Sequence, residues 1–192
     1  MKILVACEYS GIVRDAFVAK GHNAWSCDIL PTESLGNHIQ GDVLKYLDKG
    51  WDLMIAHPPC TYLSNAGARY LYPKGNLNKD RYKLGLKAKE FFMALYNSPI
   101  NKICVENPIS SRIFALPKHT QTIQPYEYGH PVQKKTCLWL KNLPQLKPTN
   151  IIYERQSTKI AGNWFNKGGK DRQKNRSKFF NGFAKSMANQ WG

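Results

Sequence analysis

Short apolar runs alternate with stretches of helical periodicity through the first half of the chain. The runs typical of buried strands are residues 2–8, 22–28, 51–56 and 101–107. Apolar side chains recur at helical spacing in residues 13–21 and 80–98. Residues 41–50 are predicted to form a short strand end or turn that leads into a helical segment. This order predicts an α/β fold with a mostly parallel sheet and helices on both faces.

The second half is less regular. Its clearest strand is predicted at residues 136–142, and residues 179–192 are typical of a terminal helix. Phe183, Met187 and Trp191 lie four residues apart there, so one helix face is expected to pack on the core. Residues 151–178 are polar, basic and glycine-bearing, and they predict a mobile loop. We expect residues 1–192 to form a single domain, since that length suits one sizeable core.

The charge balance points to a polyanionic partner. The chain has 28 Lys and Arg residues against 13 Asp and Glu residues, a formal net charge of +15. A surplus of this size favours nucleic acid, and DNA is the simplest choice. The alternative is a basic protein without such a partner.

Cysteine usage and hydropathy indicate the compartment. The five cysteines are scattered without a CxxC pair, so neither a disulfide framework nor a metal site is predicted. The first residues lack a signal-peptide pattern, because Lys2 leads directly into a short strand followed by Glu8. No apolar run approaches the length of a membrane helix. We therefore expect a reduced, cytoplasmic protein without a membrane partner.

Polar and reactive residues follow nearly every predicted strand. In parallel sheets, ligands bind beyond the carboxyl ends of the strands. Cys60 follows the stiff Pro58-Pro59 pair, and Glu106 closes another strand. A thiolate beside a carboxylic acid suits attack on an electron-poor ring, because sulfur adds at carbon while the acid holds a ring nitrogen. The alternatives are a packing role for the Cys60 thiol and an ordinary strand-end position for Glu106.

Five segments resemble motifs of the cytosine C5 DNA methyltransferases. WDLMIAHPPCTYLS resembles the family's Pro-Cys loop, and ICVENP resembles its Glu-Asn-Val motif with Pro108 in place of valine. IQGDVLKYL resembles its Gly-Asp cofactor motif, and CEYSGIVRDAF resembles its first, glycine-bearing motif. PVQKKTCLWL resembles its Gln-x-Arg-x-Arg strand. The five occur in the family's order over nearly the whole chain, and they imply a Rossmann-like S-adenosylmethionine-dependent methyltransferase fold.

The resemblance also implies roles. Cys60 would add to C6 of a flipped cytosine, Glu106 would hold N3 and the exocyclic amine, and C5 would take a methyl group from S-adenosyl-L-methionine. The residues implied for the cofactor are Tyr9, Ser10, Gly11, Asp28, Asp42, Val43 and Pro59. The residues implied for the substrate are Ser64, Asn107, Gln133 and Lys135. Asp28 and Asp42 as loop caps, Gly11 as a turn glycine and Lys135 as a solvated lysine are the alternatives.

The sequence departs from the family pattern in three respects. Val13 and Arg14 follow Gly11 where the family has further glycines. Lys135 and Cys137 stand in place of the two arginines, and lysine lacks the bidentate fork. No separate target-recognition domain is predicted, so sequence recognition would come from the basic loop or from a partner subunit.

The sequence therefore predicts a DNA cytosine C5 methyltransferase. One alternative is a pyrimidine C5-modifying enzyme that acts on RNA or free nucleotides. The other is a non-catalytic DNA-binding protein on a methyltransferase scaffold.

Overall fold

The computed structural model describes residues 1–154 and 179–192. The strands are β1 (Lys2–Ala6), β2 (Asn23–Asp28), β3 (His38–Gln40), β4 (Leu53–Ala56), β5 (Lys102–Pro108), β6 (Gln121–Ile123) and β7 (Thr136–Lys141). The α-helices are α1 (Ile12–Val18), α2 (Asn65–Ala68), α3 (Lys79–Tyr96) and α6 (Asn181–Trp191). The 3₁₀ helices are η1 (Val43–Tyr46), η2 (Pro73–Gly75), η3 (Arg112–Phe114) and η4 (Pro125–Glu127). Most of the basic segment 151–178 lies outside the described residues.

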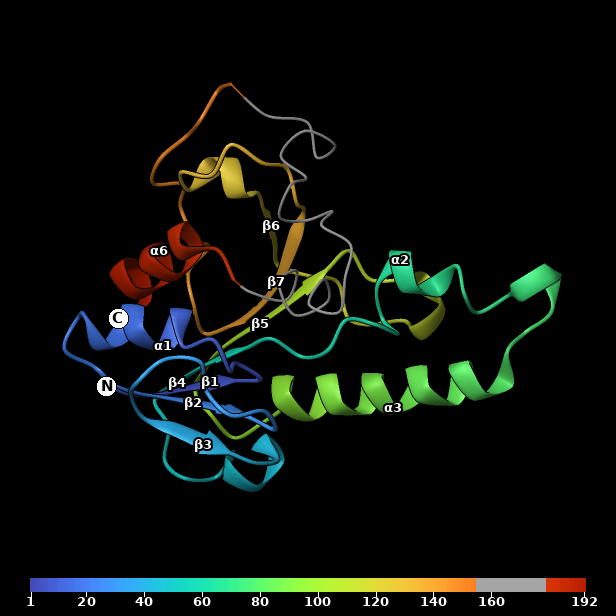
Figure 1. Cartoon of the computed structure of the whole chain (residues 1–192), viewed down its shortest axis with the longest axis horizontal. Helices are drawn as coiled ribbons and strands as arrows, with labels where there is room; N and C mark the ends of the chain where they lie inside the picture. Colours follow the sequence, from blue (N-terminus) through green and yellow to red (C-terminus); the bar gives the residue numbers. More distant parts are fainter. Residues whose placement is uncertain (155–178) are drawn as a thin grey trace.

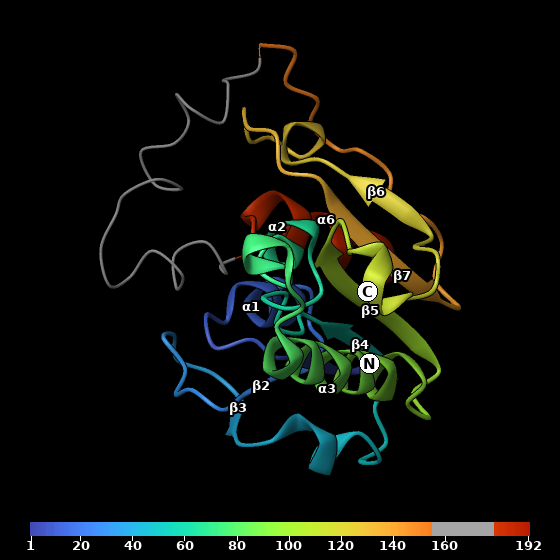
Figure 2. The same cartoon turned by 90° about the vertical axis from the view of Figure 1, so that its right-hand side faces the viewer.

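The described strands form one seven-stranded sheet in the order β3-β2-β1-β4-β5-β7-β6. Strands β1 to β5 pair in parallel, and β7 lies antiparallel between β5 and β6. Strands β3 and β6 are the two edges of the sheet (Figure 2). Because β7 runs antiparallel to β5, it begins at the end of the sheet where the parallel strands have their carboxyl ends.

Helices cover both faces of this sheet. Helices α1 and α6 pack against each other on one face (Figure 1), and α3 contacts β5 on the other. Successive side chains of β1 enter two separate cores, because a strand's side chains point alternately to opposite faces. Ile3 and Val5 pack in the core beneath α1 and α6, whereas Leu4 and Ala6 pack in the core beneath α3. This arrangement confirms the predicted α/β fold class, a Rossmann-like and mostly parallel sheet with helices on both faces.

Several predicted elements are confirmed with small changes of boundary. Strand β1 ends at Ala6, since Cys7 has a left-handed backbone (φ 59°) that breaks the strand. The segment expected to continue from a turn into a helix forms only the 3₁₀ helix η1. The docking face of the terminal helix is confirmed, because Phe183, Met187 and Trp191 of α6 are all buried. Within the described residues, no helix is both long enough and apolar enough to span a bilayer.

Candidate functional site

The polar residues predicted for the site lie at one end of the sheet, where the parallel strands have their carboxyl ends. The parallel strands β1, β2, β4 and β5 all end there, and the antiparallel β7 starts there. Ala56, the last residue of β4, lies beside Val105 of β5. The residues that follow these two, His57 to Cys60 and Glu106 to Pro108, are therefore neighbours across the edge.

The turn that carries Cys60 is fixed by hydrogen bonds on both sides. The backbone N–H of His57 donates to Ala6 O of β1 at 2.9 Å, and Asn107 Nδ2 donates to Pro58 O at 3.2 Å. After the turn, Ser64 N donates to Cys60 O at 3.0 Å. Pro58 is buried and Pro59 is exposed, and Cys60 is partly exposed. The thiol thus lies on a rigid turn that is tied to both β1 and β5.

Glu106 lies on β5 with its carboxyl mostly covered. Its side chain is 14% exposed, and Oε2 lies 3.3 Å from Nδ1 of His57. Glu106 and His57 are on the same face of the sheet because each follows a residue whose side chain enters the opposite core. The predicted catalytic carboxyl is thereby held next to the turn that carries Cys60.

The sequence interpretation missed the importance of His57. Its imidazole side chain is 11% exposed, and its ring packs on Phe179 with the centroids 4.6 Å apart. Nε2 is buried, and no hydrogen-bond partner for it occurs among residues 1–154 and 179–192. The available signal was its position: His57 continues the alternation of Leu53 and Ile55, whose side chains enter the core under α1 and α6.

Asn107 and Ser64, two of the predicted substrate residues, make local structural contacts. The buried Asn107 uses its amide nitrogen to hold Pro58 O. Ser64 is the N-cap of α2, and its Oγ accepts from Gly67 N at 3.2 Å. Both residues therefore shape the turn around Cys60.

Gln133 and Lys135, the other two, precede β7 and are exposed. Burial raises the pKa of the Cys137 thiol, and the Glu106 charge adds to this rise. The Thr122 hydroxyl and the Lys135 charge act in the opposite direction. Lys135 and Glu106 therefore both affect the Cys137 thiol: the Lys135 charge lowers its pKa and the Glu106 charge raises it.

The predicted cofactor acids come together beyond β1 and β2. Burial raises the pKa of Cys27 to about 11, and the charges of Asp28 and Asp42 contribute to that rise. The same two carboxylates raise the pKa of Cys7, again after burial as the main cause. Asp28 and Asp42 therefore share one electrostatic environment at the ends of neighbouring strands.

Both acids also have the capping roles that the sequence left open. Asp28 Oδ1 accepts from Leu30 N at 2.9 Å, and Asp42 is the N-cap of η1 through Leu44 N at 3.1 Å. Burial raises the pKa of Asp28, opposed by the N–H groups of Leu30 and Ile29 and by the His38 charge. Val43 is buried in the core beneath α3. In each carboxylate the capping hydrogen bond goes to Oδ1, so it fixes the group in place without using Oδ2.

The turn between β1 and α1 is closed by Glu8. Its Oε1 accepts from Val13 N at 2.7 Å and its Oε2 from Arg14 N at 3.1 Å. Burial raises the pKa of this carboxyl, while the His57 charge and the two N–H donors oppose the rise. The first N–H groups of α1, which in many nucleotide-binding folds face a phosphate, are thus satisfied by the chain itself.

Gly11 begins α1 with a left-handed backbone, φ 76°. A Cβ there would lie 2.1 Å from Ser34 Oγ and 2.5 Å from Arg14 Nη2, so a larger residue would displace these two side chains. The β2–β3 loop also reaches the turn through Glu33 N, which donates to Tyr9 O at 2.8 Å, and Ser34 Oγ, which donates to Ser10 O at 3.3 Å. The turn formed by Tyr9, Ser10 and Gly11 and the β2–β3 loop are thus bonded to each other, and the two are called the loop pair below.

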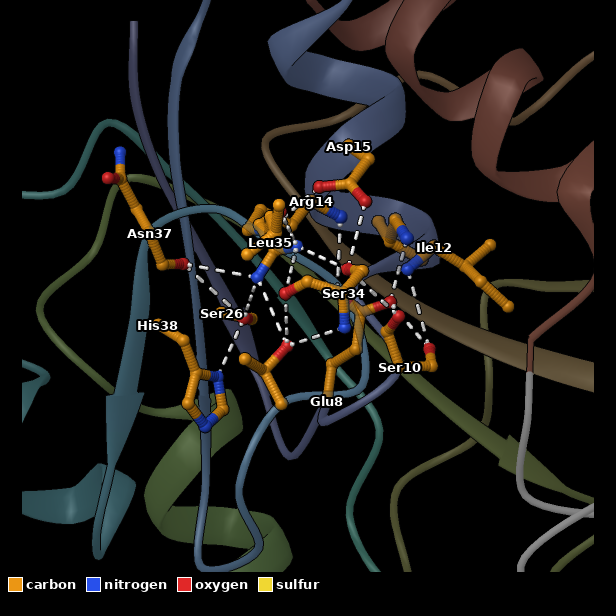
Figure 3. A network of polar contacts seen from close by, with 12 residues as sticks. Glu8, Ser10, Ile12, Arg14, Asp15, Ser26, Ser34, Leu35, Asn37 and His38 are labelled. Carbon is orange, nitrogen blue, oxygen red and sulfur yellow. Dashed lines mark hydrogen bonds and ion pairs between the residues drawn. The ribbon is translucent and has the colours of Figure 1, made fainter.

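Arg14 holds that loop pair together (Figure 3). Its side chain is fully buried and lies within the network of polar contacts drawn in Figure 3. Nε donates to Asp15 Oδ1 at 2.7 Å, Nη1 to Ser26 Oγ at 3.1 Å and Nη2 to Leu35 O at 2.9 Å. Arginine suits this site because its planar guanidinium carries several donors in a fixed fork. The residue that departs from the family's glycines is therefore the clamp of the β2–β3 loop.

Comparisons with known proteins give little further information. No protein-family model matches the chain, and no curated protein matches it. Among solved structures, the chain is similar to an E. coli protein described as a DNA modification methyltransferase encoded within a prophage, with a TM-score of 0.45 and 13% identity. The match covers 86% of this chain and 55% of the other, so the chain spans about half the length of that protein.

Proposed function

We propose that the protein is a DNA cytosine C5 methyltransferase that uses S-adenosyl-L-methionine. One observation supports this most directly: the turn that carries Cys60 and the strand that carries Glu106 are joined by Asn107 Nδ2 to Pro58 O at 3.2 Å. The His57–Glu106 contact at 3.3 Å joins them a second time. A nucleophile and an acid on one rigid edge suit addition to a pyrimidine ring.

In this proposal Cys60 and Glu106 act on opposite parts of one cytosine. The Cys60 thiolate forms a bond to C6, and the electron pair of the C5–C6 double bond moves toward N3. Glu106 hydrogen-bonds N3 and the exocyclic amine, which limits the charge that develops on the ring. C5 then becomes the nucleophilic carbon. After methylation it loses its proton, the sulfur–C6 bond breaks, and Cys60 is regenerated.

The residues at the β1 and β2 ends fit S-adenosylmethionine better than a dinucleotide. Glu8 already accepts the N–H groups of Val13 and Arg14, so the start of α1 offers a pyrophosphate a carboxylate in place of free donors. S-adenosylmethionine has no phosphate. It does have ribose hydroxyls and an adenine amine, which suit the Asp28 and Asp42 carboxylates.

The residues that would hold this cofactor are Tyr9, Ser10, Gly11, Asp28, Asp42, Val43 and Pro59. When bound, it supplies the methyl group. The protein's own part is to hold the two acids by capping and to fix the Gly11 turn through the β2–β3 loop.

DNA is the proposed substrate because of charge and access. The formal net charge of +15 favours a polyanion. A thiolate adds to C6 from a face of the ring, and stacking covers both faces in a duplex, so the cytosine must leave the duplex or start unpaired. Ser64 and Asn107 would shape the pocket, while Gln133 and Lys135, exposed ahead of β7, would face the base or a phosphate. A partner subunit for sequence recognition is compatible with this arrangement.

The direct test is methyl transfer with labelled S-adenosylmethionine to DNA, RNA and free deoxycytidine monophosphate in parallel. The proposal predicts 5-methylcytosine in DNA, identified after digestion to nucleosides. Cys60→Ser should abolish turnover and retain DNA binding. If only RNA or only the free nucleotide becomes labelled, that class is the substrate and the assignment of DNA is wrong. DNA binding without transfer to any of the three would favour the non-catalytic alternative.

A further inference from the structure

The imidazole of His57 contacts the Glu106 carboxyl and acts electrostatically on a second carboxyl, that of Glu8. Nδ1 is 3.3 Å from Glu106 Oε2 on β5. On the other side, the charge of His57 lowers the pKa of Glu8, the residue that follows Cys7 beyond β1, against the larger effect of burial. Strand β4 lies between β1 and β5, and the residue after it, His57, therefore interacts with an acid from each side: Glu8 beyond β1 and Glu106 on β5.

The described neighbours of the ring also include an aromatic side chain and a second carboxyl that has partners of its own. Phe179 packs on one side, with the ring centroids 4.6 Å apart, and supplies no charge. Glu8 is occupied by Ser10 Oγ as well as by the α1 N–H groups, and the Arg14 charge acts on it too. The charged groups that the described residues place near His57 include Glu106 and Glu8, and Arg14 acts on Glu8 in turn.

We propose that His57 is a positioning residue for Glu106, which it orients by the Nδ1–Oε2 hydrogen bond and supplies with a proton during the reaction. This inference deepens the proposed function and rests on it. A buried imidazole could have packed on apolar neighbours alone. Here its one described hydrogen bond goes to the carboxyl implied in catalysis, and both side chains are nearly covered.

The proton balance of the step is closed. The proposed step uses one proton on Glu106 Oε1 and one on His57 Nδ1, which lies 3.3 Å from Oε2. As the Oε1 proton moves to N3 of the ring, the Nδ1 proton moves to Oε2, so Glu106 stays neutral and His57 becomes neutral. The positive charge lost from His57 offsets the negative charge that the Cys60 thiolate brings to the ring. Both protons return when the sulfur–C6 bond breaks, and the C5 proton leaves to water.

Two variants separate this role from simple packing. His57→Ala removes the ring, and we expect kcat to fall about 10²-fold, the usual contribution of a positioned proton donor, with KM for DNA nearly unchanged. Millimolar imidazole should restore at least about 10-fold of the loss by filling the vacated space. His57→Asn places an amide near the position of Nδ1 and does not titrate, so the acidic-to-neutral dependence of kcat on pH should flatten.

A control histidine and a function-independent measurement complete the test. His119→Asn changes a histidine that contacts Thr122 and Trp139, and its pH profile should match the wild type. Unfolding of His57→Ala, Glu106→Gln and the double variant in urea should give coupling of about 5-fold or more in the unfolding constant.

The outcomes are distinguishable. Wild-type kcat and pH profile in His57→Ala, failure of imidazole to restore activity, or an absence of coupling would each overturn the role of His57. If the variants show coupling but the wild-type protein transfers no methyl group, both the proposed function and the proton supply that depends on it are overturned. The His57–Glu106 pairing alone would then remain.

Discussion

Asn107 donates its side-chain amide to the carbonyl of Pro58 at 3.2 Å. This bond links the residue after Glu106 on β5 with the turn that carries Cys60. Both partners are buried, and Oδ1 of Asn107 has no hydrogen-bond partner within the described residues. The amide therefore serves the turn, and the relative placement of the two proposed catalytic groups depends on it.

Replacing Asn107 by Ala should reduce kcat more than it reduces stability. The lost hydrogen bond is worth about 1 kcal/mol, whereas a small displacement of the Cys60 turn should cost about 10²-fold in methyl transfer. Asn142→Ala is the matched control, because Asn142 Nδ2 makes a similar bond to Asn101 O at 3.0 Å at the far end of β5. Equal kcat values for the two variants would contradict the positioning role.

Replacing Arg14 by Leu should destabilise the fold strongly. The variant leaves Asp15, Ser26 and the Leu35 carbonyl without their donor, and loss of one partner of a buried charged network costs about 3–5 kcal/mol. Arg14→Lys should lose less, since it keeps the charge without the fork. Urea unfolding measures both, with Lys20→Leu at an exposed position just beyond the end of α1 as the control. A midpoint equal to the control would show that the clamp is not needed.

Cys60 should be the first thiol to react in the folded protein. Burial raises the pKa of Cys104 well above its usual value and that of Cys27 to about 11, and it also raises the pKa of Cys7 and Cys137. Since the thiolate is the reactive form, these four should be almost unreactive near pH 8. Iodoacetamide followed by mass spectrometry should show one rapid addition per chain, absent in Cys60→Ser. Five rapid additions are expected only in denaturant, and early labelling at another cysteine would contradict the placement.

Acid should weaken the attachment of α6 through His130. Its Nε2 accepts from Gly182 N at 3.0 Å, which requires the neutral ring, and burial lowers the pKa of His130. The unfolded state therefore binds a proton that the folded state lacks, so stability is lost as pH falls below about 6.5.

His130→Gln should retain an acceptor for Gly182 N and show a smaller fall of the urea midpoint between pH 8 and pH 5. Part of the fall should persist, because burial and the N-terminal charge also lower the pKa of His22. An unchanged pH dependence in His130→Gln would contradict the role given to His130.

The sequence predicted the elements whose periodicity is long and apolar. Helix α6 is an example, since Phe183, Met187 and Trp191 form its buried face. Strand β6 could not be predicted, because its three residues, Gln121–Ile123, include only one that is buried. The pairing of β7 between β5 and β6 likewise depends on tertiary contacts that no local pattern encodes.

The sequence predicted that Cys60 and Glu106 act together at the strand ends, but not the contacts that position them. Cys60 and Asp42 follow strands, Asp28 ends β2 and Glu106 lies near the end of β5. Their common position at one end of the sheet comes from the parallel register of the strands. The contact of His57 with Glu106 joins residues 49 positions apart, and its geometry requires Ala56 to lie beside Val105. The Arg14 clamp was equally hidden, because its partners lie in an irregular loop with no periodicity of its own.

The most direct test of the proposed function is a covalent trap. The protein is incubated with S-adenosylmethionine and DNA that contains 5-fluorocytosine, whose fluorine cannot leave as a proton does, and the mass of the intact product is measured. We predict a protein–DNA adduct through Cys60, formed by the wild type, absent in Cys60→Ser and strongly reduced in Glu106→Gln. An adduct that survives Cys60→Ser, or the absence of any adduct with wild-type protein that binds both ligands, would contradict the proposal.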